Sequence, residues 1–168
     1  MLKDCSDLDK IRIDIVSLYF NKENMATLKD KSKTNIGSAL VLTGKPETCL
    51  SSVHCAYYGC YQLILYYLDT AFSYNDDKRK AEYDSYLQDP IASRKLGSHE
   101  YWIHKFTAFV KDKKGKVINS IQIDKNIRVL REARTEADYQ ETDFSKKQTD
   151  ELYEKARETI KMIDKSFE

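Results

Sequence analysis

Apolar residues recur along most of the chain at the spacing of one face of an α-helix. The most apolar segment runs from Cys49 to about Phe72, and its residues advance by about 100° each around a helix. One face of this segment carries Val53, Tyr57, Cys60, Ile64, Tyr67 and Ala71. Tyr58, Tyr61 and Leu65 cover much of the rest. A helix that is apolar on most sides packs against several neighbours, so this segment is predicted to be the central helix.

Four further helices are predicted around it. The first has Asn24 as its N-cap and continues through "MATLKDKSKTNIGSALVL" to the turn signal at residues 43–46. The second covers "GSHEYWIHKFTAFVKDKKGK" and ends near Gly115, and the third runs from Ile118 to about Ala137. The last begins at Ser145, where "SKKQ" matches a capping box. The pattern predicts an all-α bundle of about five helices.

Two segments fall outside this helical pattern. In residues 1–23, the alternation of Ile11, Ile13 and Ile15 fits a strand, and the same stretch also fits a helix. We interpret these residues as an N-terminal extension of uncertain structure, followed by a helical domain over residues 24–168. Within that domain, the polar segment at about residues 73–97 is predicted to be a surface insertion with a short helix before Pro90.

Composition agrees with a single folded domain. The chain has 168 residues, of which 41% are hydrophobic and 33% charged, and its net charge of +1 does not indicate a nucleic acid or membrane partner. No apolar run approaches the roughly 18 residues of a membrane span, and the start "MLKDCSDLDK" is no signal peptide. Cys49 and Cys60 would lie roughly 16 Å apart on one helix, too far for a disulfide or a shared zinc ion. We therefore predict a cytoplasmic protein with reduced cysteines and no membrane association.

Charged residues gather in two runs in the second half of the chain. The basic run consists of Lys111, Lys113, Lys114, Lys116, Lys125, Arg128, Arg131 and Arg134. The acidic run consists of Glu132, Glu136, Asp138, Glu141 and Asp143. Their plain interpretation is solvated helix faces.

The three histidines give little indication of a metal site. His99 and His104 are five residues apart, which is the wrong spacing for a metal-binding pair on one helix. The sequence also lacks a glycine-rich phosphate loop, so we predict no cofactor and no metal. His54 is interpreted as a core histidine with a local hydrogen bond, in preference to a ligand or a base. His99 is interpreted as structural or as a contact to RNA or a partner.

The stretch "LREARTEADY" places an arginine where a helix should carry an apolar side chain. With Ile127 at zero on a wheel of about 100° per residue, Leu130 falls at roughly 300° and Arg134 at roughly 340°, inside the apolar arc. Asp138 and Arg131 follow at roughly 20° and 40° along its edge. A buried guanidinium needs a partner. It can pair locally with Asp138 at a helix contact or dimer interface, or it can receive a phosphate in a polar pocket between subunits.

Four motifs, in their order along the chain, carry a resemblance to a known family. They are "AYYGCY", "GSHEYWIHKF", "LREARTEADY" and the capped helix "FSKKQTDELYEKARETIKMI". Over about residues 24–166 the chain resembles the short stand-alone HEPN-domain proteins of prokaryotes. Within that family it looks most like the branch marked by Arg-x-x-Ala-Asp-Tyr, which corresponds here to Arg134, Ala137, Asp138 and Tyr139.

The resemblance implies an up-and-down bundle of four or five helices that forms a homodimer. Many HEPN proteins are metal-independent ribonucleases of toxin–antitoxin, abortive-infection or CRISPR-linked systems. Both of their subunits contribute an Arg-x4-6-His motif to one cleft, where the 2′-hydroxyl of RNA attacks the adjacent phosphate. The resemblance assigns catalytic roles to Arg134, Asp138 and Tyr139. Arg131, Arg128 and His99 are the candidate substrate-binding residues.

The sequence departs from the family motif at the histidine. Tyr139 stands where the histidine would be, and no histidine follows Arg134. A phenol with a pKa near 10 is a poor general base at neutral pH, although it can donate a hydrogen bond to phosphate or stack on a base. Two functions stay open: an RNA-directed protein, either a weak ribonuclease or a binder, and a non-catalytic module. The module would bind a partner protein, such as a nucleotidyltransferase or another defence component. A third, a nucleotide-binding sensor, has no phosphate loop to support it.

Overall fold

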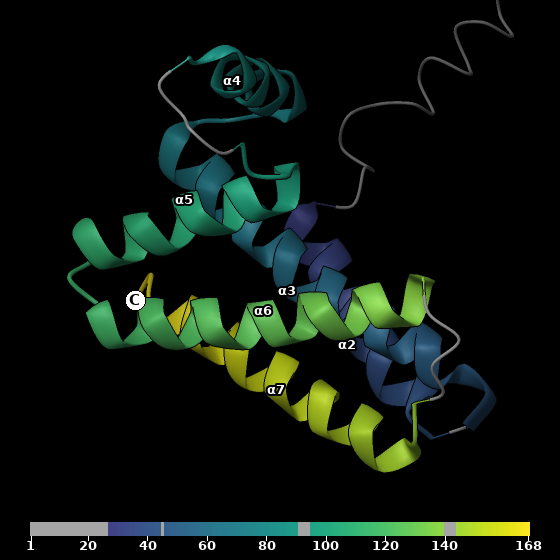
Figure 1. The fold of residues 1–168 in the computed structure, drawn as a ribbon. Helices are drawn as coiled ribbons and strands as arrows, with labels where there is room; N and C mark the ends of the chain where they lie inside the picture. Colours follow the sequence, from purple (N-terminus) through teal and green to yellow (C-terminus); the bar gives the residue numbers. More distant parts are fainter. Residues whose placement is uncertain (1–26, 45, 91–94, 140–143) are drawn as a thin grey trace, which may run out of the picture.

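The computed structural model describes residues 27–44, 46–90, 95–139 and 144–168 (Figure 1). Within these ranges the protein has six α-helices and one 3-10 turn, and no strand. The elements are α2 (Leu28–Leu42), η2 (Pro46–Thr48), α3 (Cys49–Phe72), α4 (Asp76–Gln88), α5 (Ser98–Asp112), α6 (Val117–Tyr139) and α7 (Lys146–Lys165). The predicted all-α fold is confirmed, and α4 is the short helix predicted before Pro90. The predicted extension, residues 1–23, lies outside the described residues.

The helix ends follow local signals in the sequence. The Ser145 side chain accepts a hydrogen bond from the backbone N–H of Gln148, whose own side chain accepts one from the N–H of Ser145, so the predicted capping box is confirmed. The predicted N-cap of α2 was wrong. The helix begins after Thr27, which forms a capping box with Asp30, whereas Asn24 lies outside the described residues. A Thr-x-x-Asp pair satisfies two backbone N–H groups, which a lone asparagine does not.

Helix α3 is the central helix of the bundle, and α2, α5, α6 and α7 pack around it (Figure 1). Its fully buried side chains include Val53, Tyr57, Cys60, Ile64 and Leu68. Helix α2 approaches so closely that a Cβ atom on Gly59 would lie 2.6 Å from Cγ1 of Ile36. The hydroxyl of Ser32 donates to the carbonyl of Gly59 at 2.7 Å across the same contact. This packing fixes α3 and thereby the aromatic side chains that it presents to α5 and α6.

Helix α4 lies at one end of the molecule, beyond α5 (Figure 1). Polar contacts attach it. Buried Arg79 pairs with Asp69 at the end of α3 and with Asp76. Glu82 accepts hydrogen bonds from Lys105 and, at 2.6 Å, from the hydroxyl of Tyr101, both on α5. The predicted polar insertion thus contains a helix joined to the bundle by ion pairs.

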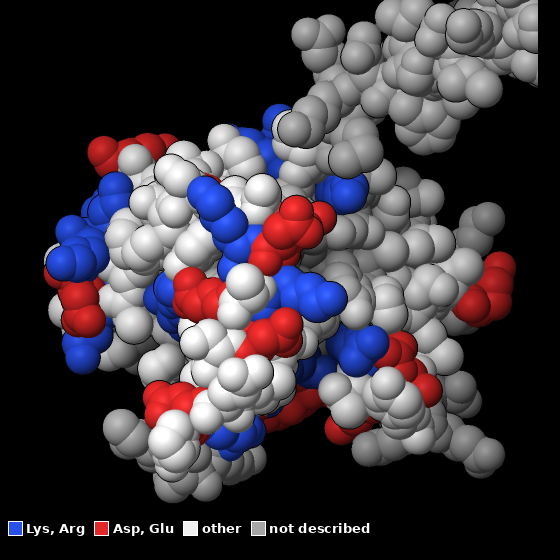
Figure 2. Space-filling view, turned by 90° about the horizontal axis from the view of Figure 1, so that it is seen from above, with Lys and Arg blue, Asp and Glu red and all other residues white. Residues whose placement is uncertain are grey.

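Three features of the described residues concern the sequence-based expectations about surface charge, cysteines and membrane. Figure 2 shows Lys and Arg interspersed with Asp and Glu over the face seen from above. Among the described cysteines, Cys55 and Cys60 are free thiols, and Cys49 is buried. Within the described ranges, no helix combines the length and apolar character that crossing a membrane requires.

Candidate functional site

Arg134 lies on α6 at its seam with α3. Its Nη2 atom is 2.7 Å from Oδ2 of Asp138, one turn further along α6, and 3.4 Å from the hydroxyl of Tyr58 on α3. The local pair of Arg134 with Asp138, one of the two accounts that the sequence left open, is therefore present. The Arg134 side chain is 21% exposed, so it is neither free in solvent nor enclosed in the core. Both contacts use Nη2, which leaves the N–H groups on Nη1 directed to neither of these partners.

A cleft of about 550 Å³ opens beside Arg134, between α3, the start of α5 and the last turns of α6. Its lining consists of Tyr57, Tyr58, Gly97, Ser98, His99, Glu100, Arg131, Arg134 and Thr135. Gly97 is the N-cap of α5 and offers no side chain to cap the first backbone N–H groups of that helix. Two guanidinium groups, an imidazole and the positive end of a helix dipole therefore border one cleft.

His99 stands in this cleft as a neutral imidazole. Burial lowers its pKa, and the nearby charges of Arg134 and Arg131 lower it further. Its Nδ1 is 2.8 Å from the hydroxyl of Tyr57, and its ring stacks on Tyr61 at 4.1 Å between centroids. Burial raises the pKa of Tyr57 well above its usual value, so the phenol keeps its proton and can donate it to Nδ1. In that arrangement the ring proton of His99 is on Nε2.

His54 is not the core histidine with a local hydrogen bond that the sequence predicted. Its side chain is 42% exposed, and Nδ1 lies 3.2 Å from Oδ1 of Asp138, which is 84 residues away in the chain. The prediction was wrong because the apolar surroundings of His54 on α3 give no sign that the last turn of α6 packs beside it. The Asp138 carboxylate thus contacts two side chains, the Arg134 guanidinium through one oxygen and the His54 imidazole through the other.

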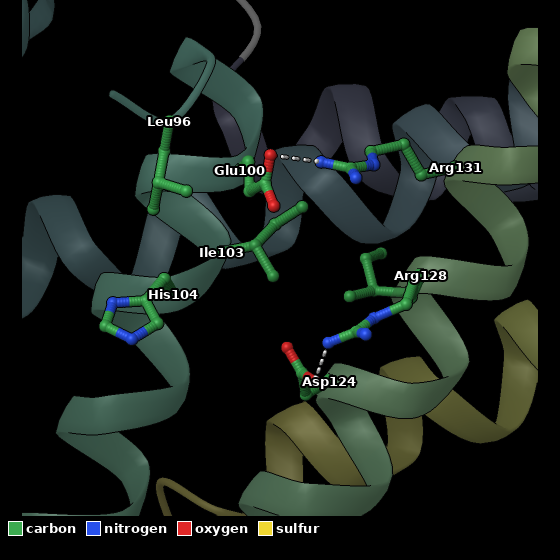
Figure 3. Close-up of a pocket in the computed structure, with 8 residues that line it drawn as sticks. Leu96, Glu100, Ile103, His104, Asp124, Arg128 and Arg131 are labelled. Carbon is green, nitrogen blue, oxygen red and sulfur yellow. Dashed lines mark hydrogen bonds and ion pairs between the residues drawn. The ribbon is translucent and has the colours of Figure 1, made fainter. Parts of the chain in front are cut away.

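Arg131 and Arg128 lie further back along α6. Figure 3 shows a neighbouring pocket of about 110 Å³, in which Arg131 faces Glu100 at 3.3 Å and Arg128 faces Asp124 at 2.9 Å. His104 lies across this pocket on α5. Arg131 lines both the pocket and the cleft, whereas Arg128 lines the pocket and is 63% exposed. Arg131 therefore shares the cleft with Arg134, whereas Arg128 lies outside it.

Tyr139 ends α6 and is 76% exposed. Its ring centroid is 6.0 Å from Cζ of Arg134, at the outer limit of a cation–π contact. Within the described chain it takes no part in the hydrogen bonds around Asp138. Tyr139, at the position of the family histidine, is thus an exposed residue beside Arg134.

Of the six predicted site residues, Arg134, Arg131 and His99 line the cleft. Asp138 pairs with Arg134 and lines a neighbouring hollow. The predicted site left out Tyr57, Tyr58 and His54, all on α3. The ring of Tyr58 packs between the two histidines, 4.6 Å from that of His54 and 5.9 Å from that of His99. The signal was present in "VHCAYYG", where a histidine and a tyrosine four residues apart share a helix face.

Fold and site together define a small all-α bundle with a cationic, aromatic-lined cleft where three helices meet. The family model of the HEPN domain matches residues 92–166, which contain α5, α6 and α7. This match, over 75 of the 168 residues, indicates a HEPN domain in this part of the chain. No curated protein and no solved structure matches it. The match begins after α3, so the helix that supplies His54 and Tyr58 lies outside it.

Proposed function

We propose that this protein binds RNA in the cleft and cleaves it as a weak, metal-independent endoribonuclease of a toxin–antitoxin or phage-defence system. The observation that carries this proposal is the placement of Arg134. Its guanidinium is held by Asp138 and Tyr58 at the wall of an open cleft, beside Arg131 and a neutral His99. Its planar fork suits the oxygens of a phosphodiester.

The surrounding groups fit a phosphate in the same place. The N-terminus of α5, which has no side-chain cap, borders the cleft, and the backbone N–H groups and positive dipole end of a helix N-terminus favour anions. The Nε2–H of His99 is a further donor. In this proposal Arg134 stabilises the charge of the phosphorane, while Arg131 and His99 hold the substrate. Attack of the 2′-hydroxyl would leave a 2′,3′-cyclic phosphate and a 5′-hydroxyl end.

We also propose that the protein acts as a cytoplasmic homodimer. Family resemblance supports a dimer in which both subunits build the cleft. Exposed Tyr139 beside Arg134 supports it too, because tyrosines are enriched in interfaces. Light scattering at micromolar concentration tests this part separately. A mass of twice the chain's 19.6 kDa supports it, and a mass of 19.6 kDa at all concentrations contradicts it.

A non-catalytic module that binds a partner protein is the second candidate. The observation favouring it is charge compensation, because Arg134 is paired with Asp138 and Arg131 with Glu100. Such pairing reduces the net positive charge that attracts RNA. A partner nucleotidyltransferase or another defence component would then use the same face, including exposed Tyr139.

Incubation of the purified protein with structured RNA, without added metal, distinguishes the two candidates. The proposal expects RNA with 2′,3′-cyclic phosphate ends from wild-type protein and its loss in Arg134→Ala. Arg157→Ala is the matched control, since Arg157 is paired with Glu154 on α7 and does not line the cleft. Equal RNA binding by wild type and Arg134→Ala, without cleavage by either, would favour the partner-binding module.

A further inference from the structure

We propose that His54, oriented by Asp138, is the general base of the cleavage reaction and replaces the histidine that the sequence lacks after Arg134. This inference rests on the proposed function. It concerns a residue of α3, outside the part of the chain that the HEPN family model matches.

One carboxylate fixes His54 relative to Arg134. Oδ1 of Asp138 is 3.2 Å from Nδ1 of His54, and Oδ2 is 2.7 Å from Nη2 of Arg134. The ring of Tyr58 supports both groups, since it packs against the imidazole of His54 at 4.6 Å and lies beneath the guanidinium, 5.7 Å from Cζ. A phosphate on Arg134 would therefore lie close to the imidazole.

Hydrogen bonding assigns different roles to the two histidines near Arg134. An ionised carboxylate only accepts hydrogen bonds, so Nδ1 of His54 carries the proton and a neutral ring has its lone pair on Nε2. His99 can take the opposite arrangement, in which Nδ1 accepts from the hydroxyl of Tyr57, 2.8 Å away, and Nε2 carries the proton. His54 can accept a proton from a substrate, while His99 can donate a hydrogen bond to it.

Space for a nucleotide is present beside His54. A hollow of about 230 Å³ lies on this side of the Arg134–Asp138 pair and is lined by Leu50, Ser51, His54, Cys55, Ala137 and Asp138. The His54 side chain is 42% exposed, so a ligand can reach it from solvent. Apolar side chains in the same lining suit the face of a ribose or base.

The proposed step conserves atoms and charge. Nε2 of His54 takes the proton of the 2′-hydroxyl as the bond from O2′ to phosphorus forms. The bond from phosphorus to O5′ breaks, and the leaving oxygen takes a proton from solvent water. The imidazolium of His54 then returns its proton to solvent, so that a 2′,3′-cyclic phosphate and a 5′-hydroxyl remain.

The test compares His54→Ala with His104→Ala, both in the full chain. His104 is an exposed histidine on α5 that does not line the cleft. Cleavage and binding are measured on one labelled RNA, with binding read from a copy that carries 2′-deoxyribose at the cleaved position. Loss of a general base lowers the cleavage rate about 100-fold or more. We expect this loss in His54→Ala, unchanged binding, and wild-type behaviour of His104→Ala.

Rescue by added imidazole separates a chemical role from a structural one. Free imidazole should restore part of the cleavage by His54→Ala and none of the cleavage by Arg134→Ala. Loss of cleavage without rescue, together with a lowered melting temperature, contradicts the inference, because His54 would then be structural.

Other outcomes separate this inference from the proposed function. Normal cleavage by His54→Ala overturns the inference and leaves the ribonuclease proposal standing. If wild-type protein binds the RNA without cleaving it, the inference falls and RNA binding alone remains. If it neither binds nor cleaves, both the inference and the proposed function fail.

Discussion

Replacing Asp138 by asparagine should change RNA binding and RNA cleavage in opposite directions. The substitution keeps the shape of the side chain and removes its charge. In the wild-type protein this carboxylate, 23% exposed, is paired with Arg134 and His54. The amide no longer neutralises the guanidinium, and it removes a negative charge that repels RNA. An amide keeps only one acceptor oxygen. With that oxygen on Arg134, its N–H faces Nδ1 of His54, which then accepts and carries its proton on Nε2.

The sizes of these effects follow from the contacts. The Asp138 carboxylate, about 5 Å from a bound phosphate, would repel it by about 1 kcal/mol at an effective dielectric constant somewhat below that of water. Removal of this repulsion should tighten RNA binding about fivefold. A partly exposed i,i+4 ion pair and one hydrogen bond together stabilise the fold by about 1–2 kcal/mol. Their loss should lower the melting temperature by about 3–6 °C. Cleavage should fall about 100-fold if His54 is the base.

Fluorescence anisotropy with labelled RNA, a cleavage time course and a thermal melt measure the three quantities. Asp150→Asn is the matched control, since Asp150 forms an i,i+4 pair with Lys146 on α7, with Nζ and Oδ2 2.6 Å apart. It should leave both RNA measurements unchanged. If Asp138→Asn binds RNA more weakly than wild type, the carboxylate supports binding, and the argument that it restrains Arg134 is refuted.

Two predictions concern the fold. Gly59→Ala should lower the free energy of unfolding by about 1–3 kcal/mol in a denaturant titration, because its Cβ would meet Ile36 at 2.6 Å, and an unchanged midpoint would contradict this close approach. At Glu82, burial acts to raise the pKa, but hydrogen bonds from Lys105, Tyr101 and Tyr74 outweigh it and hold the pKa below 4.5. The Glu82 carboxylate therefore stabilises the fold above pH 4.5, and this stabilisation is lost as the pH falls through the lowered pKa. Below pH 4.5, the melting temperature of wild type should fall further than that of Glu82→Gln. Parallel curves of melting temperature against pH for the two proteins would show that the charge of Glu82 does not hold α4 to the bundle.

Local signals in the sequence were sufficient for most helices and for Arg134. The apolar segment Cys49–Phe72 became α3 with the same bounds, and the Ser145 capping box starts α7. Arg134 lies at a helix seam, as its place on the wheel predicted, because helix geometry alone determines which face a residue occupies.

Contacts between distant segments could not be derived in this way. His54 and Asp138 are 84 residues apart, and their pairing depends on how α3 crosses α6. For the same reason the sequence placed Tyr139 in the catalytic set by its offset from Arg134, although α6 ends there and leaves the ring exposed. The start of α2 was misplaced because two cap signals lie within four residues of each other.

The affinity for a single-stranded RNA, measured over a range of salt concentrations, tests the role of Arg134 most directly. Wild type, Arg134→Ala and Arg157→Ala are compared. If Arg134 contacts a phosphate, Arg134→Ala should bind about 10- to 100-fold more weakly, and the slope of log affinity against log salt should fall by about 0.7. Arg157→Ala should match wild type in both respects. An affinity and slope for Arg134→Ala equal to those of Arg157→Ala would contradict the claim that the cleft binds RNA through Arg134.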